Sequence, residues 1–243
     1  MMHSCWRSWG HSMIGPLHQK NGLPNQDAWL ARHYSWGDVV VVSDGLGSKP
    51  HADTGAKMAC RAVCEAAKFY QKNTSAPLEE LTRLIHAMWL IFISPYCARD
   101  CAATCLFVLR IHEDIIAGQL GDGMIVLYAE QPEHNTLIAD SKDASFSNVT
   151  LALTETYQAG QWMVFRRKAE NYQAILLCTD GISDDLRPEQ QIPFTEALFC
   201  QYQRLPNQAI KKDLMHWLNA WPVQYHSDDK TIACLSRKGV LLP

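Results

Sequence analysis

Aspartates stand at the ends of apolar segments in this sequence, each beside a small residue. The clearest case is the run of valines at 39–42, which leads through Ser43 into Asp44 and Gly45. The full set is Asp27 in "NQDAWL", Asp44 in "VVSDGLG", Asp122 in "QLGDGMIVL", Asp180 with Asp184 in "LLCTDGISD", and Asp228 with Asp229 in "SDDKTIACL". Several such placements favour convergence of carboxylates at one end of a sheet. This cluster would repel itself unless cations lay between its members.

Carboxylate and carbonyl oxygens are hard ligands that suit Mg²⁺ or Mn²⁺. Glycine follows Asp44, Asp122 and Asp180, and it lets the backbone approach a ligand and offer a carbonyl as a further donor. No histidine stands beside these aspartates, which argues against zinc. Structural interpretations remain open for single residues. Asp-Gly is also a common turn, Asp122 fits a hairpin turn, and Asp184 fits a helix N-terminus.

The composition is that of an ordinary globular protein. The chain has 243 residues, 47% of them hydrophobic, 19% charged, and a formal net charge of −3. Such a length supports a substantial core. We find no Pro/Gly/Ser linker, so we expect a single domain over 1–243. Basic residues are neither in excess nor clustered, which argues against nucleic acid or an anionic membrane as a partner.

Nine cysteines lie mostly within apolar runs and form no CxxC pair. We interpret them as reduced, largely buried thiols of a cytoplasmic protein. Cys97 and Cys101 are not followed by the second pair of ligands that a structural zinc site needs. The N-terminus lacks the continuous apolar segment of a signal peptide. No apolar run approaches the ~20 residues of a membrane helix.

Hydrophobic periodicity predicts the elements that must position the acids. Strands are expected at 6–14, 28–33, 38–43, 102–111, 114–122, 123–130, 174–180 and 230–236, and helices within 56–67 and 78–93 and at 194–203 and 208–217. The three runs between 102 and 130 suggest an antiparallel meander. The segment 131–160 is polar and irregular, with no element expected. This order predicts an α+β fold, with a mainly antiparallel sheet core and helices outside it.

The sequence motifs that contain these aspartates resemble those of a known protein family. In order, "NQDA", "SDGLGS", "ATCLFVL", "LGDGMIVLY", "LLCTDGISD" and "DDKTIA" are similar to the consecutive motifs of the PPM-type (type 2C) metal-dependent serine/threonine protein phosphatases. The similarity is greatest to short bacterial members, which are stand-alone catalytic domains. It implies a four-layer αββα sandwich of two stacked antiparallel sheets flanked by helices. It also implies two Mn²⁺ or Mg²⁺ ions at one end of the sandwich.

The resemblance gives each acid a role. Asp44 would bridge both ions, and the Gly45 carbonyl would bind one of them. Asp180 and Asp228 would hold the other ion. Asp27 would act directly or through water.

The same family resemblance extends to a looser ion and to a flap. Many bacterial members bind a third ion, for which the ligands here would be Asp122 and Asp184 together with Asp180. The segment 131–160 lies where the family has a flap beside the site.

The implied reaction is hydrolysis of phosphoserine and phosphothreonine in proteins by a hydroxide bridging two divalent cations. The implied partner is a phosphoprotein made by a Ser/Thr kinase. No covalent intermediate is needed, and no cysteine here has the arginine six residues later that a cysteine phosphatase requires. Two alternatives stay open: a catalytically weak module that binds a phosphoprotein or kinase, and a phosphatase of a small phosphorylated metabolite.

Three departures from the family pattern affect substrate binding and proton transfer. Gly22 stands about where many members have an arginine that grips the phosphate, so Lys20 is the candidate substitute, without the arginine's bidentate fork. Gln26 replaces a glutamate of eukaryotic members. Leu46 stands where some members have a histidine that protonates the leaving alcohol, and His18 or His51 could supply that proton.

Asp228 and Asp229 compete for one ligand position. The family has Asp-Asn there, with a threonine two residues after the asparagine. "DDKT" aligns Asp228 with the ligand and Asp229 with the asparagine. We therefore predict Asp228 as the ligand.

Overall fold

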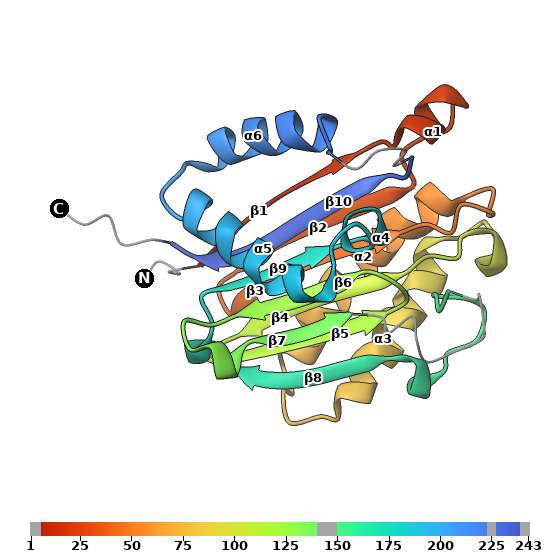
Figure 1. The fold of residues 1–243 in the computed structure, drawn as a ribbon. Helices are drawn as coiled ribbons and strands as arrows, with labels where there is room; N and C mark the ends of the chain where they lie inside the picture. Colours follow the sequence, from red (N-terminus) through yellow and green to blue (C-terminus); the bar gives the residue numbers. More distant parts are fainter. Residues whose placement is uncertain (1–5, 140–149, 223–226, 239–243) are drawn as a thin grey trace.

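The computed structural model describes residues 6–139, 150–222 and 227–238. Two five-stranded antiparallel sheets stack face to face, and helices cover both outer faces (Figure 1). This arrangement confirms the predicted α+β αββα sandwich. No helix within the described ranges combines the length and apolar character needed to cross a membrane.

Each sheet is built from strands that are distant in the sequence. The first sheet contains, in spatial order, β1 (Trp6–Met13), β10 (Lys230–Arg237), β9 (Ala174–Cys178), β6 (Met124–Tyr128) and β7 (Thr136–Ala139). The second sheet contains β2 (Asp27–Tyr34), β3 (Gly37–Asp44), β4 (Cys105–Ile111), β5 (Asp114–Leu120) and β8 (Met163–Lys168). Every neighbouring pair is antiparallel.

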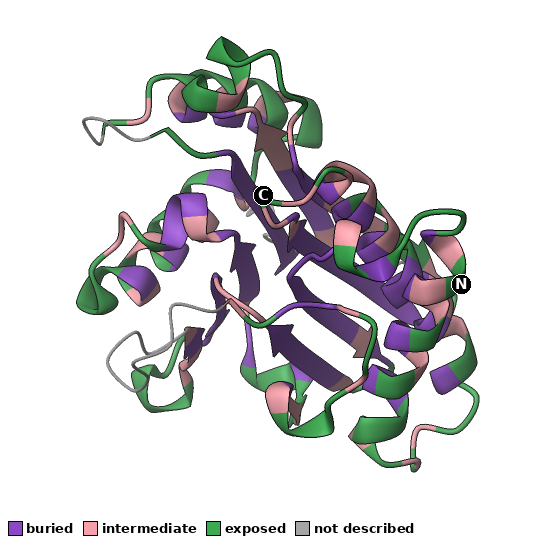
Figure 2. Ribbon diagram, turned by 90° about the vertical axis from the view of Figure 1, so that its right-hand side faces the viewer, coloured by how far each residue is buried: buried purple, intermediate pink, exposed green. Residues whose placement is uncertain are grey.

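Helices pack in pairs on the outer faces. The α-helices are α1 (Pro16–Lys20), α2 (Ala52–Tyr70), α3 (Leu78–Phe92), α4 (Asp180–Ser183), α5 (Pro188–Tyr202) and α6 (Asn207–Asn219). Short 3-10 turns lie at Ala98–Asp100, Pro132–His134, Ala159–Gln161 and Ala169–Asn171. The α2 and α3 helices contact the second sheet, whereas α5 and α6 contact the first. Figure 2 shows the buried strands between helices whose outward faces are exposed.

The valine strand explains how the layers fit together. Val39 and Val41 pack with the α2–α3 layer, whereas Val40 and Val42 pack between the two sheets. Because side chains alternate along a strand, β3 is buried on both faces, which accounts for its continuous apolar sequence. Asp44 has the same parity as Val42, so its side chain is on the face that meets the other sheet.

Four details differ from the sequence-based expectations. Neither the α1 helix nor the β8 strand was predicted. The β6 strand does not continue the β4–β5 meander but pairs with β9 in the other sheet. Within 131–160, expected to be irregular, β7 pairs with β6, and Leu153 bridges Ala103. Residues 140–149 of the expected flap lie outside the described part of the chain.

The described cysteines are all free thiols, and most of them are buried. Burial raises the pKa of the Cys64 thiol to about 12 and moves that of Cys60 well above its ordinary value. Such thiols remain protonated at neutral pH and behave as small apolar side chains.

Candidate metal centre

Two aspartates face each other across neighbouring strands at one end of the sandwich. Asp27 begins β2, Asp44 ends β3, and the register pairs them directly. Their carboxyl groups are close enough to interact directly, which lowers the pKa of Asp27 and raises that of Asp44. Two like charges directly opposite in a sheet are destabilising. The pair therefore favours a proton or a cation between its members.

The first sheet contributes Asp180 and Asp228 to the same place. Asp180 follows β9 as the first residue of α4, and Asp228 precedes β10. Both carboxylates act electrostatically on Asp44. Thr179 ties the sheets together, because its hydroxyl donates a 2.8 Å hydrogen bond to Asp27 Oδ2. We call Asp27, Asp44, Asp180 and Asp228 the carboxylate centre.

Burial and mutual repulsion change the acidity of the carboxylate centre. Burial raises the pKa of Asp27 to about 6, although hydrogen bonds from neighbouring side chains oppose the shift. Burial, followed by repulsion from Asp228, Asp27 and Asp184, raises the pKa of Asp180 to about 7. Burial and the charges of its neighbours hold the pKa of Asp44 well above its ordinary value. The centre thus resists full ionisation without a cation.

Asp229 is a structural anchor beside the centre. It is buried, and its Oδ1 accepts a 2.6 Å hydrogen bond from the Gly15 amide. Its Oδ2 accepts from the Gln26 amide at 2.7 Å and lies 2.9 Å from His18 Nδ1. Its own amide donates to Asp228 Oδ1 at 2.8 Å. With both oxygens engaged, Asp229 holds three segments together and leaves Asp228 as the ligand candidate.

Asp229→Asn is expected to destabilise the protein by about 1–3 kcal/mol. Asparagine has an NH₂ group in place of one carboxylate oxygen, and this group cannot accept the buried hydrogen bond that the oxygen accepted. Urea unfolding followed by circular dichroism measures this loss. Asp114→Asn is a matched control, since Asp114 is partly exposed and pairs with Lys168 at 2.7 Å. Its loss should cost no more than about 1 kcal/mol. Equal stability of Asp229→Asn and wild type would contradict the anchoring role.

Two glycines allow backbone segments to meet at the centre. A Cβ on Gly45 would lie 2.2 Å from the Ala52 carbonyl oxygen at the start of α2. A Cβ on Gly181 would lie 1.8 Å from the Asp229 carbonyl oxygen. Both distances are shorter than atoms tolerate, so side chains here would displace the loops that carry Asp44, Asp180 and Asp228. Packing alone therefore requires glycine after Asp44 and after Asp180. This requirement holds whether or not the Gly45 carbonyl binds a metal ion.

The remaining predicted site residues lie around the centre. Asp184 directly follows α4, is exposed, and its charge contributes to the raised pKa of Asp180. Asp122 lies in the turn between β5 and β6, where the Thr150 hydroxyl donates to its Oδ2 at 2.9 Å. Lys20 is the exposed last residue of α1. The His51 ring packs against that of Tyr96, with centroids 4.0 Å apart and planes tilted by 35°. Their functional roles stay predictions.

Within residues 6–139, 150–222 and 227–238, no group of three or more His, Cys, Asp or Glu side chains is arranged as a metal ligand set. The chemistry of the donors nevertheless fits a hard divalent cation. All four groups of the carboxylate centre are oxygen donors, and the raised pKa values of Asp27, Asp44 and Asp180 reflect burial and a repulsion that a cation would remove.

Sequence reasoning missed the groups that orient these acids. The Thr104 hydroxyl accepts a 2.9 Å hydrogen bond from the Asp44 amide, and the Thr104 amide donates to the Asp44 carbonyl at 2.7 Å. Thr179 contacts Asp27 from a position 152 residues away. The hydroxyl residue directly before Asp180 was the available signal for Thr179. Thr104 lies in the motif "ATCLFVL", but nothing in that motif indicates a contact with Asp44.

Comparisons with known proteins agree with the geometry. The model of the family described as Protein phosphatase 2C matches residues 14–219. The serine/threonine phosphatase PstP/Ppp of Mycobacterium tuberculosis is similar in structure, with a TM-score of 0.62, 18% identity, and coverage of 96% of this chain and 99% of that chain. Stp1 of Staphylococcus aureus has a TM-score of 0.62 at 12% identity, covering 96% of this chain and 95% of its own. A search of curated proteins found no match.

Proposed function

Because this chain belongs to the protein phosphatase 2C family, we propose that it hydrolyses phosphoserine and phosphothreonine in proteins, with divalent cations bound at the carboxylate centre. One observation carries the proposal: carboxylates from separate segments of both sheets converge, and burial together with the charges of the neighbouring acids raises the pKa values of Asp27, Asp44 and Asp180. Because carboxylates bind a metal in their ionised form, Mn²⁺ or Mg²⁺ would displace these protons and compensate the clustered negative charge.

The proposed roles follow from position. Asp44, central among the four acids, would contact two ions, and the Gly45 carbonyl would contribute to one of them. Asp180 and Asp228 would hold the other ion, while Asp27 would orient the ligands around Asp44. When bound, such ions supply acidified water and neutralise the charge on the phosphoryl group. Asp122 and Asp184 would serve a third ion.

Similar proteins support the choice of metal. The PstP catalytic domain, similar to this chain with a TM-score of 0.60 and 18% identity, was solved with two manganese ions. RsbX, with a TM-score of 0.57 and 10% identity, was solved with magnesium. We propose a phosphoprotein made by a Ser/Thr kinase as substrate and the cytoplasm as the place of action.

The test is release of phosphate from p-nitrophenyl phosphate and from phosphothreonine and phosphoserine peptides. Turnover is expected with Mn²⁺ and should stop with excess EDTA. Lys20→Ala should raise KM for all these substrates if Lys20 contacts the phosphate. Turnover that survives EDTA would overturn the metal mechanism. Hydrolysis of small phosphates without hydrolysis of any peptide would favour a metabolite phosphatase.

A further inference from the structure

A hollow of about 310 Å³ adjoins the carboxylate centre. Two loops form it, the one before β2 and the one between β3 and α2. Its lining residues are Leu23, Pro24, Gln26, Gly47, Ser48, Lys49, Pro50 and Asp53. The hollow is adjacent to the centre because Gln26 directly precedes Asp27, and its carbonyl accepts the amide of Gly45 at 3.1 Å. The hollow therefore lies beside the two segments that carry Asp27 and Asp44.

The floor of the hollow contains an unsatisfied polar atom. Gln26 is only 6% exposed, and its Oε1 is buried without a hydrogen-bond partner among the described residues. Buried carbonyl oxygens of this kind are normally paired. A Cβ built on Gly47 would lie 3.5 Å from this oxygen, so Oε1 lies on the side of Gly47 to which a side chain would project. The atom needs an N–H or O–H donor, which a ligand can provide.

The wall of the hollow carries an uncompensated positive charge. Lys49 is half-buried, and none of the described residues forms an ion pair with its ammonium group. The carboxylate in the hollow, Asp53, is already paired with Lys57 at 2.8 Å. Pro24, Pro50 and the exposed Leu23 supply apolar surface for methylene groups. The lining thus matches a short aliphatic side chain that ends in a negative charge.

We propose that this hollow is a specificity subsite for an acidic residue next to the phosphorylated residue of a protein substrate. The carboxylate of the substrate would pair with Lys49, and a rotation of the Gln26 side chain would let Oε1 accept from the main-chain amide of the substrate. The assignment rests on the proposed function for the position of the phosphate. It goes beyond that function because it specifies which phosphoproteins are preferred.

Binding of phosphonate peptides measures the preference without turnover, since a methylene group replaces the scissile ester oxygen. Labelled peptides carry Glu, Gln or Lys on either side of the phosphonate residue, and fluorescence polarisation with Mn²⁺ gives Kd. Wild type should bind the Glu peptide roughly three- to fivefold tighter than the Gln peptide, as expected for one partly exposed ion pair. Lys49→Glu should reverse the order and favour the Lys peptide.

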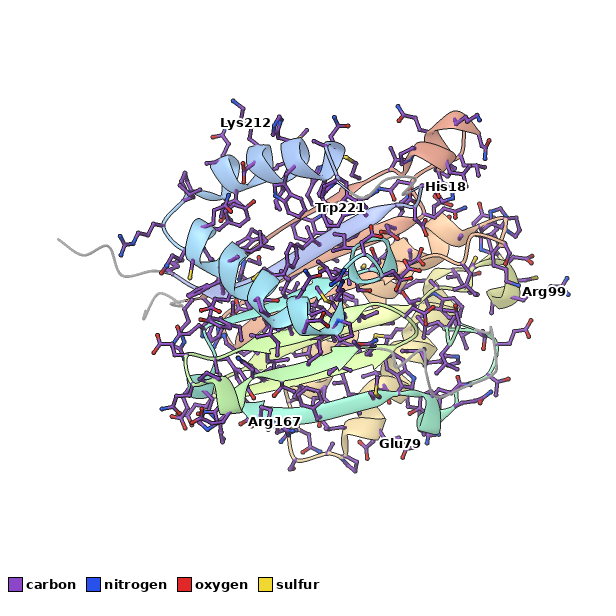
Figure 3. All side chains as sticks on the ribbon, viewed as in Figure 1. His18, Glu79, Arg99, Arg167, Lys212 and Trp221 are labelled. Atoms are coloured by element: carbon purple, nitrogen blue, oxygen red, sulfur yellow. The ribbon has the colours of Figure 1, made fainter. Side chains whose placement is uncertain are left out.

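Gly47→Leu tests the hollow itself. A Cβ at Gly47 makes only the 3.5 Å contact, so the variant should fold, and its side chain should fill the hollow and abolish the preference for Glu. Gly160→Leu is the matched control, because a Cβ there meets nothing within 4 Å. Lys212→Glu on α6, whose side chain points away from the sandwich, controls for the change of charge (Figure 3). Both controls should keep the wild-type preference.

The outcomes separate the subsite from the proposed function. The subsite is overturned if no peptide binds, if Glu and Gln peptides bind equally, or if Lys49→Glu weakens every peptide to the same extent, which would place Lys49 on the phosphate. If the preference is present but the corresponding phosphate esters are not hydrolysed with Mn²⁺, the subsite stands and the phosphatase function fails.

Discussion

Asp44→Asn is expected to abolish metal-dependent phosphate release and, at the same time, to stabilise the metal-free protein. The loss of activity should be on the order of a thousandfold, which corresponds to about 4 kcal/mol of transition-state stabilisation. The gain in stability follows from the direct interaction between Asp44 and Asp27. An asparagine amide can donate to Asp27 as a protonated carboxyl would, but it adds no negative charge.

Two measurements on the same samples check this opposite behaviour. Phosphate release with Mn²⁺ reports activity, and calorimetry in EDTA reports Tm, which should rise by about 2–4 °C for each kcal/mol gained in a domain of this size. Asp114→Asn, on the partly exposed pair with Lys168, should change neither. If Asp44→Asn retained metal-dependent turnover, the catalytic ions would have to lie elsewhere. If Asp44→Asn lowered Tm, and the activity of wild type were insensitive to EDTA, Asp44 would have only a structural role.

The sequence predicted the position of Asp44 because local pattern determines it. A strand of four valines is buried on both faces, and the first polar residues after it must lie at the end of the sheet. The same reasoning holds for Asp180 after β9. Asp27, Asp44 and Asp180 could therefore be assigned to one end of the sandwich before any contact was known.

Features that depend on distant contacts were not predictable in this way. Asp229 binds Gly15, His18 and Gln26 across more than 200 residues, and no local pattern reports such pairing. The change of sheet between β5 and β6 takes place at Gly121 and Gly123, whose φ angles are +91° and +117°. Glycine permits this conformation, but it does not identify the sheet that receives the next strand. The β8 strand is partly exposed at a sheet edge, so it lacks the apolar run that marks the central strands.

Metal-free protein should lose stability as pH rises from about 4 to 7, because the pKa values of Asp27 and Asp180 are raised to about 6 and about 7 in the folded state. A raised carboxyl pKa means that the folded protein holds these protons more tightly than the unfolded chain. Their contribution is fully present below the unfolded pKa of about 3.9. It disappears as pH passes through the folded values.

The double variant Asp27→Asn/Asp180→Asn isolates this effect from other titrating groups. In EDTA, the Tm of the variant minus that of wild type should be small near pH 4 and should reach a plateau above about pH 7, since only wild type must ionise these buried groups. Added Mn²⁺ should remove most of the difference at pH 7.5 by raising the Tm of wild type alone, because ligands that bind only the folded state stabilise it. If the Tm difference between variant and wild type did not depend on pH, these carboxylates would not repel one another. The argument for a cation between them would then fail, even if the enzyme were active.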